Sequence, residues 1–460
     1  MSSLEPRVAA DLIENLRARV RGRVIDPAAN DYDEARRGFY SGFDRRPLAI
    51  VRVVDAADVA AVLGIVRDAG VPLAVRSGGH SPAGHSTADG GVVLDLAAMK
   101  RLDVDVSSRS AWADAGLTAG EYTDAAGAHG LVTGFGDAGS VGISGITLCG
   151  GVGFLHRRFG MTIDNVLAAE VVTASGEILH VDAGQHEDLF WAIRGGGGNF
   201  GVVTRWHYRL HEIGTVLAGI VVLPATPDII PAVLDAVMEA PEALSGVIAV
   251  MPAPPMPFFP PEVHGRMIVM VNLVHSGTEE EADRDVARLR SIATPLMEML
   301  QRVPYPAVYH HGEPPKPPLM AMRPTFADTI GRDEAERIID GLRTSRARMS
   351  VTHFRVLGGA VARVPNDATA FAHRDRGTMA IVAAAVMDPA EWHEHQAWAD
   401  ALAAGLQQGT PGAYTGFMGA DDTSRVREAY GDAAWRKLTR IKAKYDPANL
   451  FRLNQNIPPG

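Results

Sequence analysis

A glycine-rich loop that contains a histidine is the first feature of the sequence with an evident chemical use. A short apolar run, typical of a strand, is followed by Arg76, Ser77, Gly78, Gly79, His80 and Ser81. Paired glycines let backbone N–H groups turn inward and approach an anion closely, and a serine adds a hydroxyl donor. The loop therefore predicts a pyrophosphate site with an imidazole beside it.

Two later segments are placed to enclose the same ligand. The first is the glycine-rich segment 142–153, whose main chain can lie against a flat or phosphorylated molecule. Its candidate residues are Gly142, Ser144, Gly145, Gly150, Gly151 and Gly153. Positions that could close such a ligand in are Asn165, Asn199, Gly201 and Val202. The glycine run 195–198 follows a predicted helix and precedes a strand, which is the reverse of the Rossmann order. We therefore expect no nicotinamide cofactor.

The order of these segments resembles the flavin domain of the vanillyl-alcohol oxidase and p-cresol methylhydroxylase superfamily, and within it the berberine bridge enzyme-like oxidoreductases. The resemblance covers residues from about 47 to 210 and from about 362 to the C-terminus. The segments that carry it are RSGGHS, GISGITLCGGVG, FGMTIDN, DLFWAIRGGGGNFGVVT, FAHRD and KYDPANLFRLNQNIPP. It implies that the chain binds FAD, with the first loop on the pyrophosphate.

The resemblance also gives His80 a covalent role. In this family the histidine is joined to the 8α-methyl group of the isoalloxazine, and a neutral imidazole nitrogen is a suitable nucleophile for that bond. Many relatives carry a second tether, a cysteine on flavin C6, and that position is Ala138 here. Cys149 lies eleven residues later, and we interpret it as a small buried apolar residue. We expect a single covalent bond.

Proton transfer is assigned by resemblance as well. The family often supplies a tyrosine from a strand before the C-terminal block, which is Tyr414 here, although Gly416 replaces the usual asparagine. The alternative role for Tyr414 is packing. A free phenol titrates near pH ~10, so as a base it needs a lowered pKa or a water that takes its proton away. Val141 corresponds to a position beside the flavin where side-chain size influences oxygen access, and valine favours an oxidase.

Four further residues are site candidates by the same resemblance. His373 and Arg374 match a family element near the flavin-facing side of the substrate domain, where Arg374 can stabilise negative charge. For His373 a local role, bonded to nearby carbonyls and carboxylates, is an equal alternative. Asn454 and Asn456 are placed near the cofactor as amide donors and acceptors, or alternatively as turn caps.

The periodicity of apolar residues predicts the elements that hold these loops. Strands are predicted over 48–54, 72–76 and 91–96, and a helix buries Val59, Val62, Leu63 and Val66. A hairpin over 167–181, a helix over 187–193 and an exposed strand over 202–210 follow. The six glycines of residues 138–155 indicate a tightly folded loop.

The second half of the chain has a different pattern. Long apolar strands alternate with charged helices such as 279–292, which predicts an antiparallel sheet covered on one face. The fold class is therefore α+β, with an FAD-binding domain at 1–212 (core about 43–212), a substrate-binding domain at 213–417, and a C-terminal segment at 418–460 that returns to the FAD domain. Proline-rich stretches at 252–261 and 312–319 are predicted surface loops or pocket lids. Residues 444–460 are predicted to be an ordered extension held by polar partners.

Composition excludes several functional classes. The 44 basic residues against 54 acidic residues give a net charge of −10, which argues against nucleic acid as a partner. The single cysteine excludes an intrachain disulfide framework and a Cys-rich metal site, and it fits a reducing cytoplasm. The histidines at 310–311 and 392–395 lack the spacing of a zinc helix, so we expect no metal. We predict neither a signal peptide nor a membrane span.

These observations together predict an FAD-dependent oxidase. A C–H bond of a small organic substrate would give a hydride to flavin N5, and O2 would regenerate the flavin with release of H2O2. A dehydrogenase with a different electron acceptor and a non-catalytic flavin- or ligand-binding protein remain alternatives. The hydrophobic second half favours a larger, partly apolar substrate, while the sequence leaves homo-oligomer formation open.

Overall fold

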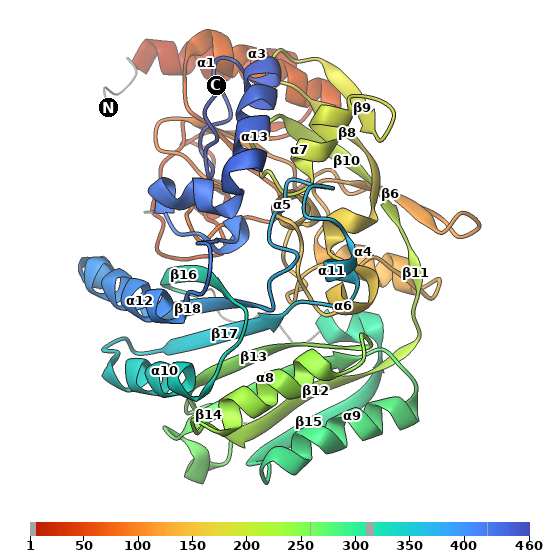
Figure 1. Ribbon diagram of the computed structural model, residues 1–460. Helices are drawn as coiled ribbons and strands as arrows, with labels where there is room; N and C mark the ends of the chain where they lie inside the picture. The colour runs from red at the N-terminus through yellow and green to blue at the C-terminus, as the bar shows by residue number, and fades with distance from the viewer. Residues whose placement is uncertain (1–5, 258, 310–316, 421) are drawn as a thin grey trace.

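The computed structural model describes residues 6–257, 259–309, 317–420 and 422–460. The chain forms three main sheets, arranged in two halves (Figure 1). The half that carries both termini contains a four-stranded and a five-stranded sheet, and the other half is built on a seven-stranded sheet. The predicted α+β class is confirmed, whereas the exact domain boundaries stay a prediction.

The four-stranded sheet supports the predicted pyrophosphate loop. Its strand order is β1 (Arg23–Ile25), β2 (Ala49–Arg52), β4 (Val92–Asp95) and β3 (Leu73–Arg76), with β2, β4 and β3 parallel and β1 antiparallel. Helices α1 (Pro6–Arg19) and α3 (Ala56–Ala69) pack against it, and the short α2 (Tyr32–Ala35) follows β1. The side chain of Asp55 caps α3, and Gly70 ends it at φ 65°, where glycine avoids the steric cost of a Cβ.

The five-stranded sheet is antiparallel, and it corrects one expectation. Its order is β5 (Leu102–Asp105), β6 (Ser110–Asp114), β10 (Val202–Arg209), β8 (Val166–Val172) and β9 (Ile178–Asp182). The strand predicted to be exposed, β10, is the central strand. Arg205, His207 and Arg209 lie on the partly exposed face, whereas Thr204, Trp206 and Tyr208 on the other face are fully buried. Alternation of polar and apolar residues indicates that one face of a strand is solvent-accessible. It does not indicate whether the strand lies at the edge or in the centre of its sheet.

Further helices and short strands complete this half. They are α4 (Ala119–Gly127), β7 (Leu131–Val132), α5 (Ile143–Cys149), α6 (His156–Phe159), η1 (Thr162–Asn165), α7 (Glu187–Ile193), β11 (His211–Glu212), η5 (Thr415–Phe417), η6 (Asp422–Ala429) and α13 (Gly431–Tyr445). The segment 138–155, predicted to be a loop, contains the helix α5. Burial of Ile143, Ser144 and Thr147 stabilises this short helix despite Gly145 in its interior.

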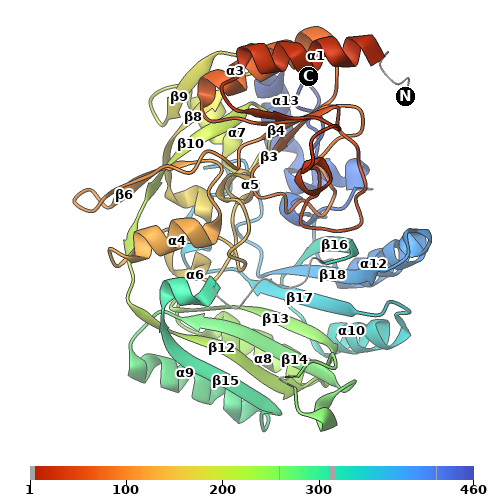
Figure 2. The same cartoon turned by 180° about the vertical axis from the view of Figure 1, so that it is seen from behind.

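The seven-stranded sheet is antiparallel throughout. Its order is β15 (Met297–Pro304), β12 (Thr215–Pro224), β14 (Met267–His275), β13 (Leu244–Pro252), β17 (Ser350–Val356), β18 (Thr378–Val386) and β16 (Leu319–Ala327). One face is covered by α8 (Ile229–Glu239), α9 (Glu279–Ile292), α10 (Arg332–Thr344) and α12 (Trp392–Leu406), as predicted. The remaining elements of this half are η2 (Pro261–Val263), η3 (Tyr305–Tyr309), α11 (Ala360–Arg363) and η4 (Pro389–Glu391). The other face of the sheet is turned toward the first half of the chain (Figure 2).

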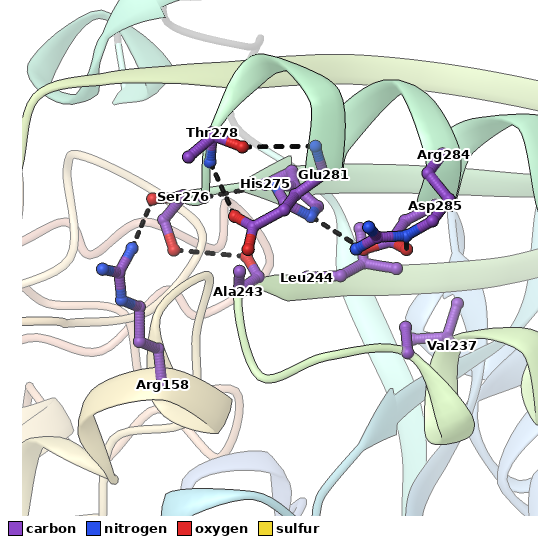
Figure 3. A network of polar contacts seen from close by, with 12 residues as sticks. Arg158, Val237, Ala243, Leu244, His275, Ser276, Thr278, Glu281, Arg284 and Asp285 are labelled. Carbon is purple, nitrogen blue, oxygen red and sulfur yellow. Dashed lines mark hydrogen bonds and ion pairs between the residues drawn. The ribbon is translucent and has the colours of Figure 1, made fainter.

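Helix α6 fastens the two halves together. The buried guanidinium of Arg157 donates four hydrogen bonds of 2.6–2.9 Å to the carbonyls of Val237, Met238, Ala240 and Leu244, around the end of α8. The carbonyls of Val237, Met238 and Ala240 lie at the C-terminal end of α8, where a helix cannot satisfy its own acceptors, and Leu244 is the first residue of β13. Arg158 donates to the carbonyl of Ser276, at the start of α9 (Figure 3). Beside it, the buried His275 pairs with Asp285 at 2.9 Å.

The C-terminal tail lies among the elements of the first half, as Figures 1 and 2 both show. The Asn454 amide donates to the Gly198 carbonyl at 3.0 Å, and the Ile457 N–H donates to Asn199 Oδ1 at 2.9 Å. The prediction of an ordered, polar-held extension is therefore confirmed. Of the two proline-rich stretches, residue 258 and residues 312–316 lie outside the described residues, as do His310 and His311.

Candidate active site

A cavity of about 400 Å³ lies where the loops of the first half meet the C-terminal segment. It is lined by residues from separate stretches of chain, near positions 40, 80, 96, 140, 200, 415 and 453. The sequence-predicted residues on its wall are Arg76, Ser77, Gly78, Gly79, His80, Ser81, Val141, Gly142, Ser144, Gly145, Gly201, Val202, Tyr414 and Asn454. Folding thus brings most of the predicted site to one place.

Glycines allow two of these stretches to touch. A Cβ on Gly78 would fall inside contact distance of Gly142 N, and a Cβ on Gly142 would collide with Gly78 N in return. At Gly145 and Gly198 a Cβ would meet no described atom within 4 Å, so both leave main chain open toward the cavity. Such exposed backbone suits a ligand that approaches closely.

The polar groups of the pyrophosphate loop are used differently from one another. Arg76 pairs with Asp95 at 2.8 Å through one nitrogen, while its buried Nη1 has no partner among the described residues. Asn454 Oδ1 is likewise buried without a described partner. Ser77, predicted to donate to an anion, donates instead to the Ala115 carbonyl at 2.7 Å. Its hydroxyl therefore supports the loop.

His80 lies on the cavity wall with its ring stacked on Phe39. The ring centroids are 3.8 Å apart and the planes meet at 18°. Burial lowers the pKa of His80 to about 4, against a weaker opposing effect from the backbone at Ser140. The imidazole is therefore neutral at physiological pH and keeps the lone pair that a nucleophile needs.

Tyr414 reaches the cavity from the C-terminal side. Its hydroxyl accepts a hydrogen bond of 3.0 Å from the Gly151 N–H, and its side chain is buried. Burial raises the pKa of Tyr414 well above its usual value, and the neighbouring Cys149 adds to this. The lowering that a free phenolate would require is not seen, so Tyr414 is a neutral phenol. Burial also raises the pKa of the Cys149 thiol, which lies on the cavity wall.

Eight predicted site residues do not line the cavity, namely Gly150, Gly151, Gly153, Asn165, Asn199, His373, Arg374 and Asn456. Arg374 is 1% exposed and forms a two-pronged ion pair with Asp164, at 2.6 and 2.9 Å. His373 lies 3.1 Å from the Glu428 carbonyl, in agreement with its local alternative. Both side chains stay out of the cavity for the same reason. Each is held by a polar partner outside the cavity wall, which is Asp164 for Arg374 and the Glu428 carbonyl for His373.

The asparagines and glycines of this group have structural contacts. The Asn165 amide donates to the carbonyls of Phe159 and Met161, and Asn199 joins the glycine run to the C-terminal tail. Gly150, at φ 134°, and Gly151, at φ 83°, leave no room for a Cβ beside Met161 and Thr162. They shape the wall behind Tyr414.

Comparisons with known proteins agree with this geometry. Residues 47–182 match the family model described as an FAD binding domain, and residues 413–458 match the model described as berberine and berberine like. An uncharacterized FAD-linked oxidoreductase, YgaK of Bacillus subtilis, is 30% identical, and the alignment covers 96% of this chain and 98% of YgaK. This chain is a member of the berberine bridge enzyme-like group of the vanillyl-alcohol oxidase and p-cresol methylhydroxylase superfamily. It is an FAD-dependent oxidoreductase.

Two further proteins similar to this flavoprotein have named activities. The (R)-6-hydroxynicotine oxidase of Paenarthrobacter nicotinovorans is 29% identical over 96% of this chain and 97% of its own length. A solved structure of the glucooligosaccharide oxidase of Acremonium strictum, titled for its 6-S-cysteinyl, 8α-N1-histidyl FAD, is 22% identical. It matches with a TM-score of 0.85 over 98% of this chain and 99% of its own, and shows a shared fold.

The flavoprotein's cavity fits FAD by its own residues. The open glycine backbone and the unpaired Arg76 Nη1 are donors suited to a pyrophosphate, and Asn454 Oδ1 is a free acceptor. Within the described part of the chain no group of three or more His, Cys, Asp or Glu could hold a metal ion. No helix in that part is both long enough and apolar enough to span a bilayer.

Sequence reasoning missed several residues of this site. Phe39 and Tyr40 line the cavity, but nothing in their local sequence indicates it. His85 lies on the same wall with its pKa lowered by burial to about 4, and its place five residues after His80 was a usable signal. Asp137 lines the cavity and pairs with Arg355 of β17 at 2.5 Å, across the two halves of the chain.

Proposed function

We propose that this flavoprotein is an oxidase with FAD bonded covalently to His80 alone. FAD, when bound, supplies the hydride acceptor at N5, and O2 reoxidises it with formation of H2O2. The single observation that carries the proposal is the neutral, stacked imidazole of His80 on the wall of a glycine-lined cavity. The covalently bound flavin named for the glucooligosaccharide oxidase supports it.

A second tether is absent from this proposal because Ala138 lines the cavity where a cysteine would be needed. Cys149 is also on the wall, but its thiol pKa is raised by burial, so little thiolate forms. We propose Val141 as the residue that governs oxygen access, because it lines the same cavity. The single cysteine of the chain supports a cytoplasmic location.

We propose Tyr414 as the residue that takes the substrate's hydroxyl or amine proton. Because its pKa is raised, the phenol must release its own proton to water as it accepts the new one. Its oxygen is fixed by the Gly151 N–H, which leaves the O–H free to point toward the cavity. In this proposal Arg374 and His373 do not take part in proton transfer. They support the neighbouring wall through their contacts with Asp164 and the Glu428 carbonyl.

The proposal is tested in two steps. The purified protein is denatured in acid, and we expect yellow fluorescence to stay with the polypeptide and to be lost in His80→Ala. A panel that includes (R)-6-hydroxynicotine, 1-phenylethanol and xylobiose is then screened under nitrogen for flavin bleaching, and H2O2 is measured in air.

Bleaching with H2O2 formation supports an oxidase. Bleaching that air does not reverse, but an artificial acceptor does, identifies a dehydrogenase. Tyr414→Phe is expected to slow bleaching at least about 100-fold, within the usual contribution of a positioned acid or base, while keeping the flavin spectrum. An unchanged bleaching rate in this variant rules out the assignment of Tyr414.

A further inference from the structure

Strand β15 forms one edge of the seven-stranded sheet, and its outer side is open (Figure 2). No residue of β15 is buried, whereas most residues of β12 beside it are. Within the described ranges, no hydrogen bond from outside the sheet reaches the main chain of this strand. Unpaired N–H and C=O groups along a strand are a template on which another strand can pair.

The opposite edge of the sheet, strand β16, is closed. Alternate carbonyls of β16 accept side-chain hydrogen bonds of 3.3–3.4 Å, from Gln396 to Met322, from Arg425 to Pro324 and from Arg376 to Phe326. Pro324 also lacks the N–H that a pairing strand would need. Side chains and proline are usual means of protecting an edge. The fold therefore protects one edge of this sheet and leaves the other available.

Alternate residues of β15 turn their main-chain groups outward. A Cβ added to Gly219 of β12 would lie 1.9 Å from the carbonyl oxygen of Met299, so this carbonyl faces β12. Successive residues of an antiparallel strand bond to opposite sides. The N–H and C=O groups of Glu298, Leu300 and Arg302 therefore point away from the sheet. Pro304, which has no N–H, ends this row.

The sequence around Leu300 is self-complementary when two copies of β15 lie antiparallel. If Leu300 lies opposite its counterpart in the second copy, Glu298 lies opposite Arg302, and Met297 lies opposite Val303. Each of these pairs forms twice, because the two copies are equivalent. Opposite charges across a strand pair stabilise it, and like charges destabilise it. This register therefore joins opposite charges to one another and apolar side chains to one another.

The side chains of β15 are accessible for such a contact. Glu298 pairs with Arg290 of α9 at 2.5 Å, and Arg302 lies 3.6 Å from Glu279 of the same helix. Each of these four side chains is at least a quarter exposed, so both charges of β15 can be reached from the edge. On the other face of the strand, Met299 is 51% exposed. Pairing with a second strand would remove part of this apolar surface from water.

We propose that the open edge of β15 is an interface between two copies of this chain, which join antiparallel around Leu300 into one continuous sheet. A second copy is the occupant that this edge fits, because its charges and apolar side chains complement themselves in the register of the outward-pointing groups. About six main-chain hydrogen bonds would form. The contact is isologous, so it closes at a dimer. It does not include the cavity, and the inference is therefore independent of the proposed function.

The test measures the mass of the holoenzyme in solution by sedimentation equilibrium over a range of micromolar concentrations. We expect a dimer in the parent protein. Glu298→Arg and Arg302→Glu each place like charges opposite one another twice, so each should raise the dissociation constant of the dimer by about 10-fold or more. An equimolar mixture of the two variants restores opposite charges at both pairs, and a heterodimer should form with about the parent's affinity. Arg346→Glu makes the same change of charge at an exposed site outside β15 and should leave the constant unchanged.

The outcomes decide the inference whether or not the flavin chemistry is as proposed. A dimeric parent, weaker homodimers in both charge-reversed variants and a heterodimer in their mixture support it. A monomeric parent overturns it, and so does a dimer that neither charge reversal weakens, because such a dimer uses a different surface. A mixture that forms no heterodimer, from variants that keep the parent's circular dichroism, also overturns it. Arg302→Pro removes an outward N–H without breaking a bond to β12, and an unweakened dimer in this variant would contradict the edge pairing even if the charge-reversed chains failed to fold.

Discussion

The lowered pKa of His80 makes a quantitative prediction about the pH dependence of flavin attachment. Covalent bond formation requires the neutral imidazole. With the pKa at about 4, about 90% of His80 is neutral at pH 5, compared with about 3% for a solvent-exposed histidine of pKa about 6.5. Because the neutral form prevails above the lowered pKa, the capacity to react is present from pH 7 down to pH 5 and is lost only near pH 4.

The assay follows covalent incorporation over time. Apoprotein prepared without riboflavin is mixed with excess FAD at pH 7 and at pH 5, samples are quenched in acid, and flavin fluorescence is measured on the denatured polypeptide. We expect the two rate constants to agree within about twofold, since with the lowered pKa about 90% of His80 is neutral at pH 5 and nearly all of it is neutral at pH 7. An ordinary histidine would slow by about 25-fold.

The stacked neighbour provides a matched variant. Phe39→Ala removes the ring that lies 3.8 Å from His80 and admits water, so the His80 pKa should move back toward 6.5 and incorporation should become slower at pH 5. A fall of 20-fold or more in the parent protein between pH 7 and pH 5 would refute the burial argument. Covalent flavin in His80→Ala would refute the attachment site itself.

Three other predictions concern the walls of the cavity and the joint between the halves. Gly142→Ala should abolish flavin loading and lower the free energy of unfolding by about 1–3 kcal/mol, because its Cβ collides with Gly78 N. Arg157→Leu should cost about 3 kcal/mol or more in denaturant unfolding, since it leaves four carbonyls around the end of α8 unsatisfied. Ala138→Cys in a His80→Ala background should restore acid-stable flavin through a cysteinyl bond, measured as added mass on the intact chain.

Controls for these variants are present in the same chain. Gly64→Ala, inside α3 with no described atom within 4 Å of the added Cβ, should raise stability by up to about 1 kcal/mol. Arg346→Leu removes an exposed arginine and should change stability by less than about 0.5 kcal/mol. Equal losses in Arg157→Leu and Arg346→Leu, or normal flavin loading in Gly142→Ala, would contradict the reasoning. So would an Ala138→Cys chain that releases all of its flavin.

Much of the site could be predicted from sequence because its parts are local. The pyrophosphate loop needs only consecutive glycines after a strand, and the helices α7 and α9 begin and end at the predicted residues. Val59, Val62, Leu63 and Val66 are all fully buried, as their helical spacing predicted. The periodicity of apolar residues and the preferences of turn residues depend on only a few consecutive residues, so they can be seen in the sequence directly.

The environment of each side chain could not be predicted in the same way. Asp137 and Arg355 are 218 residues apart in sequence and meet only because β17 is placed opposite the cavity loop. The pKa values of Tyr414 and His80 depend on burial by residues from distant elements, and β10 became a central strand through pairing with β6 and β8. The sequence by itself determined the family, the class of cofactor and the position of the pyrophosphate loop. Tertiary packing decided the electrostatics, because desolvation and ion pairing depend on what surrounds a group and not on its place in the chain.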